Sequence, residues 1–259
     1  MLIDSHTHLE MKAFDRDRKE VIERAFEGGV TQMITIGTDL SSSTRALELA
    51  QQYDFIYSTV GFHPHHAKET DVEQLNELVQ LAAEPKVVAW GEMGLDFFRN
   101  YSPPERQIDI FNHQLDMVMG NDLPIIIHDR EAHKEVIDIL KSRGVNQYRG
   151  VIHCFSGDYN LAMTFIDMGF YLSIPGNVTY PKAFQTQDVA ARIPIERLLI
   201  ETDAPFLTPL PLRGKRNEPL FVTYTAQKIA NLRNMGFQEL ARKTSENAVK
   251  LFHLPPGIE

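Results

Sequence analysis

Short apolar runs rich in β-branched residues recur along the chain, and each is followed by a polar stretch or a helical pattern. Most of the runs are continuously apolar rather than alternating, which is typical of parallel strands buried on both faces. The pattern therefore predicts strands at residues 2–4, 32–36, 55–60, 86–90, 124–127, 150–152, 170–174 and 198–200.

Between the predicted strands, apolar residues recur at the period of an amphipathic helix. Residues 21–26 mark one such helix, which the glycine pair at 28–29 would end. The same period marks helices within 75–82, before a proline, and within 136–140, before a glycine. The last part of the chain, from about 223 to 252, is expected to be helical throughout.

The alternation of eight strands with helices over roughly 250 residues is the pattern of a (β/α)₈ barrel. We therefore expect an α/β fold of the TIM-barrel type with C-terminal helices, forming one domain over residues 1–259. The alternative is an open, doubly wound sheet, which usually has fewer strands and often carries a glycine-rich phosphate turn. The sequence contains no GxGxxG motif and no P-loop motif, which weakens that alternative.

Histidine, aspartate and glutamate side chains stand at the ends of several predicted strands. In a (β/α)₈ barrel all C-terminal strand ends lie at the same mouth, where active sites are built, so these side chains would converge. They are Asp4, His6 and His8 at the first strand, His63 and His65 at the third, Glu92 at the fourth, His128 and Asp129 at the fifth, His153 at the sixth, and Glu201 and Asp203 at the eighth.

His6 and His8 give the strongest indication of a metal site. They alternate on one strand, so both imidazoles point to the same face. If that face is the barrel interior, neither ring fits a dry apolar core without a partner. His128 and His153 add two imidazoles after neighbouring strands. Imidazole and carboxylate groups are ligands for borderline or hard divalent ions, so we expect a metal centre here.

Composition narrows the class of protein. The 259 residues are 43% hydrophobic and 24% charged, which is ordinary for a globular enzyme. The single cysteine excludes an internal disulfide framework, and the sequence shows neither an apolar signal core nor the run of about 18 apolar residues that a membrane span needs. We therefore expect a cytoplasmic protein that has no membrane partner, and we infer no obligate protein partner.

The charge balance argues against a protein that coats long nucleic acids. The chain has 26 basic and 35 acidic residues, a net charge of −9 with neutral histidines. Coating DNA requires many lysines and arginines to neutralise phosphates. Local binding of a nucleic acid remains compatible with this charge, because carboxylates that hold metal ions no longer repel phosphate once the ions are bound.

The opening sequence DSHTH at 4–8 resembles the HxH motif of amidohydrolase-like barrels. Further motifs, in order over almost the whole chain, narrow the resemblance to the TatD family of metal-dependent deoxyribonucleases. They are GFHPH at 61–65, GEMGLD at 91–96, IH at 127–128, HCFSG at 153–157, ETDAP at 201–205, RGKRNEP at 213–219 and NA at 247–248.

This resemblance implies a site for two divalent cations, such as Mg²⁺, Mn²⁺ or Zn²⁺. One ion would be held by His6, His8, Glu92 and Asp203, and the other by Glu92, His128 and His153. Glu92 would bridge the ions, at the position where many related amidohydrolases use a carbamylated lysine. The implied activity is that of a 3′→5′ exonuclease and endodeoxyribonuclease, with DNA that has short or single-stranded ends as the substrate.

Roles can be assigned from the chemistry of phosphodiester hydrolysis. Two neighbouring ions supply a hydroxide near neutral pH and stabilise charge on the phosphate oxygens. Glu92 and Asp203 would be the catalytic carboxylates, with Asp203 orienting the water and accepting its proton. His63 and His65 would donate to the phosphate or to the leaving oxygen.

Further residues would support the site from its surroundings. Glu201 would fix a ligand histidine, and Asp96 would act behind the ligands or on a sugar hydroxyl. Arg213, Lys215 and Arg216 form a basic loop that would hold substrate phosphate. This loop is also compatible with a solvated surface.

Two alternatives stay open. The same barrel and ligands could form a metal-dependent amidohydrolase that cleaves a C–N or ester bond of a small or aminoacyl substrate, because metal–hydroxide chemistry is shared. The basic loop and the absence of a bridging lysine favour a phosphodiester. The second alternative is a non-enzymatic barrel with a structural metal. Structural sites are closed and often use cysteine, which does not fit carboxylates and histidines at an open mouth.

Overall fold

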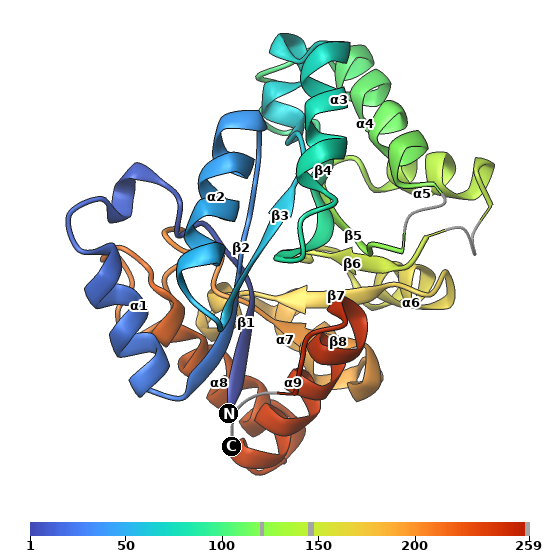
Figure 1. The fold of residues 1–259 in the computed structure, drawn as a ribbon. Helices are drawn as coiled ribbons and strands as arrows, with labels where there is room; N and C mark the ends of the chain where they lie inside the picture. The colour runs from blue at the N-terminus through green and yellow to red at the C-terminus, as the bar shows by residue number, and fades with distance from the viewer. Residues whose placement is uncertain (120–121, 145–147, 257–259) are drawn as a thin grey trace.

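The computed structural model describes residues 1–119, 122–144 and 148–256. Eight parallel strands form one sheet in which each strand pairs with the next in sequence, and the sheet curls into a nearly closed barrel (Figure 1). This architecture confirms the predicted TIM barrel, with a strand on each predicted apolar run. The strands are β1 (Leu2–Thr7), β2 (Val30–Thr35), β3 (Ile56–Val60), β4 (Val87–Asp96), β5 (Ile125–Arg130), β6 (Gly150–Ile152), β7 (Tyr171–Ile174) and β8 (Leu198–Ile200).

Helices cover the outer face of the barrel (Figure 1). Asp39, Asp71 and Asp158 cap the N-termini of three of them, because each carboxylate accepts a hydrogen bond from a backbone N–H of the first turn. The helices are α1 (Arg18–Glu27), α2 (Leu40–Gln52), α3 (Val72–Leu81), α4 (Pro104–Val118), α5 (His133–Ser142), α6 (Tyr159–Asp167), α7 (Phe184–Arg192), α8 (Val222–Arg233) and α9 (Phe237–Phe252). No helix within the described ranges has the length and apolar character needed to cross a bilayer.

The C-terminal stretch predicted as one helical region forms two helices. Asn234 ends α8 in the left-handed conformation, with φ of 54°, and Gly236 precedes α9. Asparagine is one of the few residues that adopts this conformation readily at a helix end. The break turns α9 back across the barrel.

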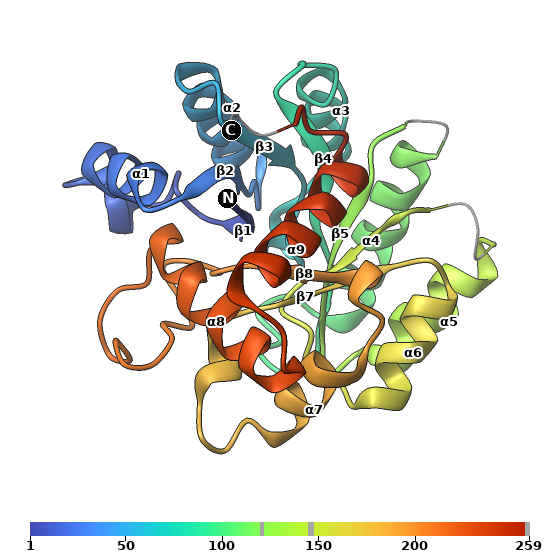
Figure 2. The same cartoon turned by 90° about the horizontal axis from the view of Figure 1, so that it is seen from below.

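Two apolar cores hold the barrel together. The larger one lies between the strands and the surrounding helices. The smaller one fills the barrel interior with residues such as Ile34, Ile126 and Leu199, and it includes Leu251 and Phe252 of α9. Seen from below, α9 lies across this end of the barrel (Figure 2). Because α9 closes the end where the strands begin, a polar site has room only at the opposite mouth, where the strands end.

Strand β4 is longer than predicted and carries an irregularity at the site. It continues past residue 90 to Asp96, and its register against β5 shifts by one residue between Trp90 and Met93. An extra residue in a strand re-aims the neighbouring side chains, and such bulges often occur next to active sites. Gly91 permits the close approach of β5, because a Cβ atom there would lie 2.5 Å from a backbone oxygen of Ile126. Glu92 therefore projects from within a strand rather than from the loop after it.

The gap between β8 and β1 is closed mainly by individual hydrogen bonds. The carboxylate of Asp4 accepts hydrogen bonds from the backbone N–H of Thr202 at 2.9 Å and from its hydroxyl at 2.5 Å. Asp4 is fully buried, and this burial raises its pKa to about 8. Thr7 adds an isolated bridge to Ala204. These contacts bring the first and last motifs of the sequence side by side.

Candidate metal centre

The predicted metal ligands converge at the mouth of the barrel around one carboxylate, that of Glu92. They are His6, His8, Glu92, His128, His153 and Asp203. Glu92 is only 2% exposed. Its Oε2 atom faces the histidines of the β1 end, and its Oε1 atom faces those that come from β5 and from the end of β6. The two carboxylate oxygens thus serve two separate groups of donor atoms.

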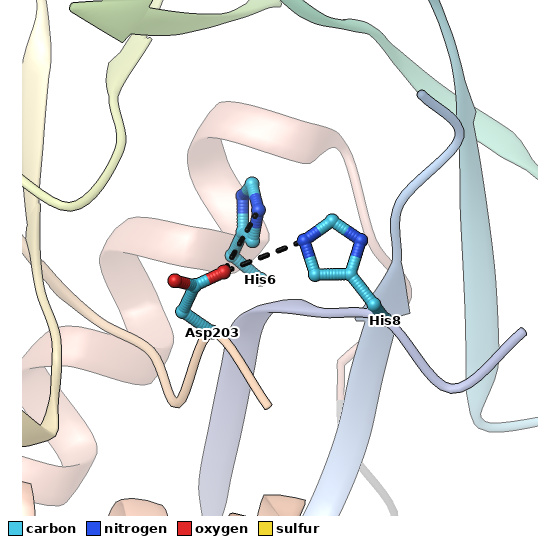
Figure 3. Close-up of side chains that lie close together, drawn as sticks. All are labelled: His6, His8 and Asp203. Carbon is cyan, nitrogen blue, oxygen red and sulfur yellow. Dashed lines mark ion pairs between the residues drawn. The ribbon is translucent and has the colours of Figure 1, made fainter. Parts of the chain in front are cut away.

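The first donor group consists of His6, His8, Asp203 and Oε2 of Glu92. Oδ1 of Asp203 lies 3.8 Å from Nε2 of His6 and 3.4 Å from Nε2 of His8 (Figure 3). Oε2 of Glu92 lies 3.5 and 3.9 Å from the same nitrogens. Ligands that each lie about 2.1 Å from one ion can be at most about 4.2 Å apart. All four separations are therefore short enough for a shared cation.

The second donor group consists of His128, His153 and Oε1 of Glu92. Oε1 lies 2.8 Å from Nδ1 of His128 and 2.7 Å from Nε2 of His153, and these nitrogens are 3.1 Å apart. The same limit of about 4.2 Å permits a shared cation here. The two groups meet at Glu92, as the resemblance implied for a bridging ligand.

Buried ring nitrogens without partners show that the donor set suits a metal. Within the described ranges, both ring nitrogens of His6 and Nδ1 of His8 and His153 are buried without a hydrogen-bond partner. A buried polar atom left unpaired costs about 1–3 kcal/mol. Coordination would satisfy Nε2 of His6, and nitrogen and carboxylate donors match divalent ions such as Zn²⁺ and Mn²⁺. The residues present therefore fit a metal centre.

Three of the histidines have a buried carboxylate behind the ring nitrogen that points away from the centre. Nε2 of His128 lies 3.3 Å from Asp96, and Nδ1 of His153 lies 3.6 Å from Glu201. Nδ1 of His8 lies 3.6 Å from Glu10. Such carboxylates fix the ring orientation and tautomer of a metal-binding histidine. Glu201 and Asp96 thus lie where a supporting role was predicted.

Glu10 was missed by the sequence analysis. It lies two residues after His8, beyond the end of β1, and its Oε2 atom accepts a hydrogen bond of 2.8 Å from the hydroxyl of Thr35. The spacing of two residues from His8 was the available signal, but a single glutamate after a strand is usually a solvated residue. Only the fold shows that Glu10 is buried behind the imidazole.

His63 lies beside the second donor group but is arranged as a hydrogen-bond donor. Its Nε2 atom is 3.3 Å from Oε1 of Glu92. Its Nδ1 atom accepts a hydrogen bond from the backbone N–H of His65 at 3.0 Å, so a neutral ring carries its proton on Nε2. Burial lowers the pKa of His63 to about 3, which keeps the ring neutral. This tautomer leaves no lone pair on Nε2 for a metal.

His65 lies at the rim of the site, where it was predicted to meet the substrate. Its Nε2 atom forms a 2.8 Å hydrogen bond with Asp96, which also receives backbone N–H groups of Phe98 and Arg99. Burial raises the pKa of Asp96, but the hydrogen bonds with His128 and His65 outweigh it and hold the pKa below its usual range. Asp96 therefore stays ionised and ties the rim to the second donor group.

The two predicted catalytic carboxylates are also held in the ionised form. Burial raises the pKa of Glu92, but the neighbouring charge of His153 and hydrogen bonds with His128 and His153 outweigh it, so the pKa lies well below its usual value. Burial is likewise outweighed at Asp203, where a hydrogen bond with His8 lowers the pKa. Ionised carboxylates are the form that binds cations.

The local backbone aims Asp203 at the first donor group. Asp203 adopts a left-handed conformation with φ of 54°, and its carbonyl accepts a hydrogen bond from the backbone N–H of Phe206. Its own N–H donates to the carbonyl of His6. The buried side chain of Asn217 holds the loop by donating hydrogen bonds to the carbonyls of Thr202 and Phe206.

The structure does not place the predicted basic loop at the site. The guanidinium of Arg216 forms two hydrogen bonds with Asp17, at 2.8 and 2.7 Å, and lies over the ring of Phe14. Arg213 lies over the ring of Tyr180. Neither arginine lines the cavity at the mouth of the barrel. The guanidinium of Arg216 is thus engaged by Asp17, the residue that precedes α1. Because Asp17 lies about 200 residues earlier in the sequence, the basic motif alone could not reveal this pair.

A cavity of about 640 Å³ opens onto the centre. Its volume lies within the range of about 300–1,000 Å³ that is usual for ligand sites. Its other lining residues include Arg99, Tyr101, Arg130 and Phe206, which were not selected from the sequence. Two arginines are thus present at the mouth, although not the two that were expected.

This arrangement has the parts needed for metal-assisted hydrolysis. Its two donor groups are adjacent and share the carboxylate of Glu92. Its cavity gives a substrate access to them, and Asp203 faces the cavity with an ionised carboxylate. Paired ions with an open coordination position activate water against ester, phosphodiester or amide bonds. The geometry of the ligands does not by itself choose among these bonds.

Comparison with known proteins identifies relatives along the whole chain. The profile of the family described as TatD related DNase matches residues 3–253. An uncharacterized metal-dependent hydrolase of Bacillus subtilis, YabD, is 46% identical over 98% of this chain and 100% of its own length. The 3′-5′ ssDNA/RNA exonuclease TatD of Erwinia tasmaniensis is 40% identical over 98% of this chain and 100% of its own.

Solved structures show the same fold. The crystal structure of YjjV, a TatD homologue of Escherichia coli, superposes with a TM-score of 0.92 at 33% identity, and the match covers 98% of each chain. A TatD-family hydrolase of Entamoeba histolytica superposes with a TM-score of 0.89 at 25% identity, over 97% of each chain.

Proposed function

Because this chain belongs to the family of TatD-related DNases and is a metal-dependent hydrolase, we propose that it cleaves phosphodiester bonds of DNA. The proposed mode is 3′→5′ exonucleolytic and endonucleolytic cleavage of short or single-stranded ends. One observation carries the proposal: the two oxygens of Glu92 face two separate donor groups. Two ions held there would stabilise both the attacking and the leaving oxygen of a phosphodiester, and Arg99 and Arg130 at the same cavity favour a phosphate over an amide.

Two divalent cations, such as Mg²⁺, Mn²⁺ or Zn²⁺, would occupy the two donor groups. His6, His8 and Asp203 would hold the first, His128 and His153 the second, and Glu92 both. The cations, when bound, supply a water of lowered pKa and neutralise charge on the phosphate. The positive charge of the bound cations would also offset, at the site, part of the net charge of −9 that would otherwise repel DNA.

The protein's own groups would move the protons. Asp203 faces the cavity with an ionised carboxylate, so its free oxygen can orient the attacking water and take its proton. His63 is neutral with its N–H on Nε2 and lies at the cavity, so it can donate a hydrogen bond to a phosphate oxygen or to the leaving oxygen. The leaving oxygen would take its proton from the protonated Asp203 or from solvent. Glu10, Glu201 and Asp96 would keep the ligand imidazoles in their tautomers and orientations.

The alternative of a metal-dependent amidohydrolase acting on a small substrate is less well supported. Arg99 and Arg130 line the cavity as cationic groups, and guanidinium groups suit phosphate oxygens better than a neutral amide.

The test is cleavage of a short, 5′-labelled single-stranded DNA by the Mn²⁺-loaded protein, with Asp203→Asn as the matched variant. We expect the wild-type protein to shorten the strand from its 3′ end, and the variant to lose at least 100-fold in rate, as expected for loss of a general base. A panel of small amides serves as the comparison. Hydrolysis of an amide by protein that leaves the DNA intact would establish the alternative.

A further inference from the structure

Two exposed aromatic rings flank the two halves of the metal centre. Tyr101 is 56% exposed and its ring meets the edge of His65, with centroids 4.7 Å apart. Phe206 is 50% exposed and its ring meets His8, with centroids 6.1 Å apart. His65 belongs to the rim of the second donor group, and His8 to the first. Both rings line the cavity, so a bound ligand would meet one ring on each side of the centre.

Two unpaired guanidinium groups lie at the same cavity. Arg99 and Arg130 are both exposed, and within the described ranges neither has a carboxylate within ion-pair distance. Several other arginines of this acidic chain, such as Arg143 and Arg216, are paired with aspartates. Arg130 lies over the ring of Phe98, 4.2 Å from its centroid, which holds the guanidinium in place while its N–H donors stay free. These donors are therefore available to an anionic ligand.

We propose that these four residues bind the nucleotides on either side of the cleaved bond, an inference that rests on the proposed nuclease function. Phe206 stacks on the base next to the first donor group, and Tyr101 stacks on the base next to the second. Arg99 and Arg130 bind the backbone phosphate on the side of Tyr101. The four residues thus set the preference of the site for single-stranded polynucleotides over small phosphodiesters.

The ligands of the metal centre lie deep in the cavity. Glu92, His6, His8 and His153 are nearly completely buried, so the phosphate to be cleaved must enter the cavity, and the flanking nucleotides must cross its rim. Bases that cross the rim need partners for their faces, and aromatic side chains provide these without regard to sequence. In a duplex the base faces are already stacked within the helix, so the rings offer nothing to double-stranded DNA. Guanidinium groups without acidic partners add the phosphate contacts.

The experiment measures binding separately from cleavage. In the Asp203→Asn background, the affinity for a fluorescently labelled single-stranded 12-mer is determined by anisotropy for Tyr101→Ala and Phe206→Ala, alone and combined. Stacking on an aromatic side chain contributes about 1–3 kcal/mol per base, so each substitution should weaken binding at least about fivefold. Tyr101→Phe and Phe206→Tyr keep the rings and should keep the affinity.

An abasic probe shows whether the rings contact bases. The same 12-mer is prepared with abasic sites at its two 3′-terminal positions. If the rings stack on bases, the alanine substitutions should change affinity for this probe by less than twofold, because the partner of each ring is already missing. An equal loss on intact and abasic probes would mean that the rings do not stack on bases, and would overturn the proposal.

Salt dependence tests the arginines. Arg99→Gln combined with Arg130→Gln should weaken binding of the intact 12-mer and reduce the slope of log affinity against log salt, by about 0.7 for each phosphate of a single strand that the protein no longer neutralises. The matched controls are Arg45→Gln on α2 and Phe184→Ala on α7, which are exposed side chains that do not line this cavity. An unchanged slope in the double variant would reject the binding of phosphate by these arginines.

The outcomes separate this inference from the proposed function. If wild-type protein cleaves single-stranded DNA but the four substitutions leave its binding unchanged, only the inference fails. If wild-type protein neither cleaves nor binds the strand, the proposed nuclease function fails first. Equal losses of affinity for single-stranded and double-stranded probes would show a general phosphate surface and would also reject base stacking.

Discussion

The imidazole rings of His6 and His153 stack face to face at the mouth of the barrel, with centroids 4.0 Å apart and ring planes within 8° of each other. They belong to different donor groups and approach different oxygens of Glu92. Burial lowers the pKa of His6, and the charge of His153 lowers it further, so His6 is held neutral. Glu92 and the stacked pair together join the two donor groups into one centre.

Removing the two histidines of one donor group should remove one ion. We expect His128→Ala combined with His153→Ala to reduce bound Mn²⁺ from about two ions per chain to about one, and His6→Ala combined with His8→Ala to do the same from the other side. Metal content is measured by plasma mass spectrometry after desalting, with circular dichroism to confirm folding. His113→Ala, an exposed histidine on α4, is the control. Unchanged stoichiometry in either double variant would remove those histidines from the ligand set.

Glu10→Gln should weaken metal binding without removing a ligand. Loss of a carboxylate behind a metal-binding histidine typically costs 10–100-fold in affinity or activity, and Glu10 lies 3.6 Å from Nδ1 of His8. We expect a loss in this range for one of the two ions, measured by titration against a chelating indicator. Glu27→Gln at the end of α1 is the matched surface control. Equal affinities in Glu10→Gln and the control would leave Glu10 as a structural residue only.

The ion pair of Arg216 with Asp17 should contribute to stability rather than to DNA binding. Both side chains are partly exposed, so Arg216→Gln should cost at most about 1 kcal/mol of unfolding free energy at pH 7. A hydrogen bond from Arg216 lowers the pKa of Asp17. Because this pKa is depressed on folding, the stabilisation is present above the ordinary aspartate pKa and is lost as the pH falls through the folded value.

Urea unfolding at pH 7 and at pH 3 checks this prediction for Arg216. The difference between wild type and variant should shrink at the lower pH. If Arg216→Gln also changed the salt dependence of DNA binding, Arg216 would contact the substrate, as the basic motif first indicated, and this prediction would be wrong.

The sequence predicts much of this fold and site for identifiable physical reasons. Buried parallel strands such as β5 and β8 are continuous apolar runs, and the barrel rule then brings His128 and Asp203 to one mouth. The extension of β4 to Asp96 could not be predicted, because its glycines and polar residues are typical of a loop. Pairing with β5 keeps these residues in the sheet.

Contacts between distant segments could not be predicted. Glu10 is indistinguishable from a solvated glutamate until Thr35 and His8 enclose it. Arg216 looks free in the sequence because its partner Asp17 lies at the other end of the chain. Arg130, by contrast, follows His128 at the end of β5, and a position two residues after a mouth histidine could have suggested a place at the cavity.

We propose that the carboxylate of Glu92 lies between two cations. Anomalous diffraction from crystals grown with Mn²⁺ tests it most directly. We expect two anomalous peaks at the barrel mouth, one beside His6, His8 and Asp203 and one beside His128 and His153, with one oxygen of Glu92 bound to each. A single peak at full Mn²⁺ occupancy, or peaks away from Glu92, would contradict it.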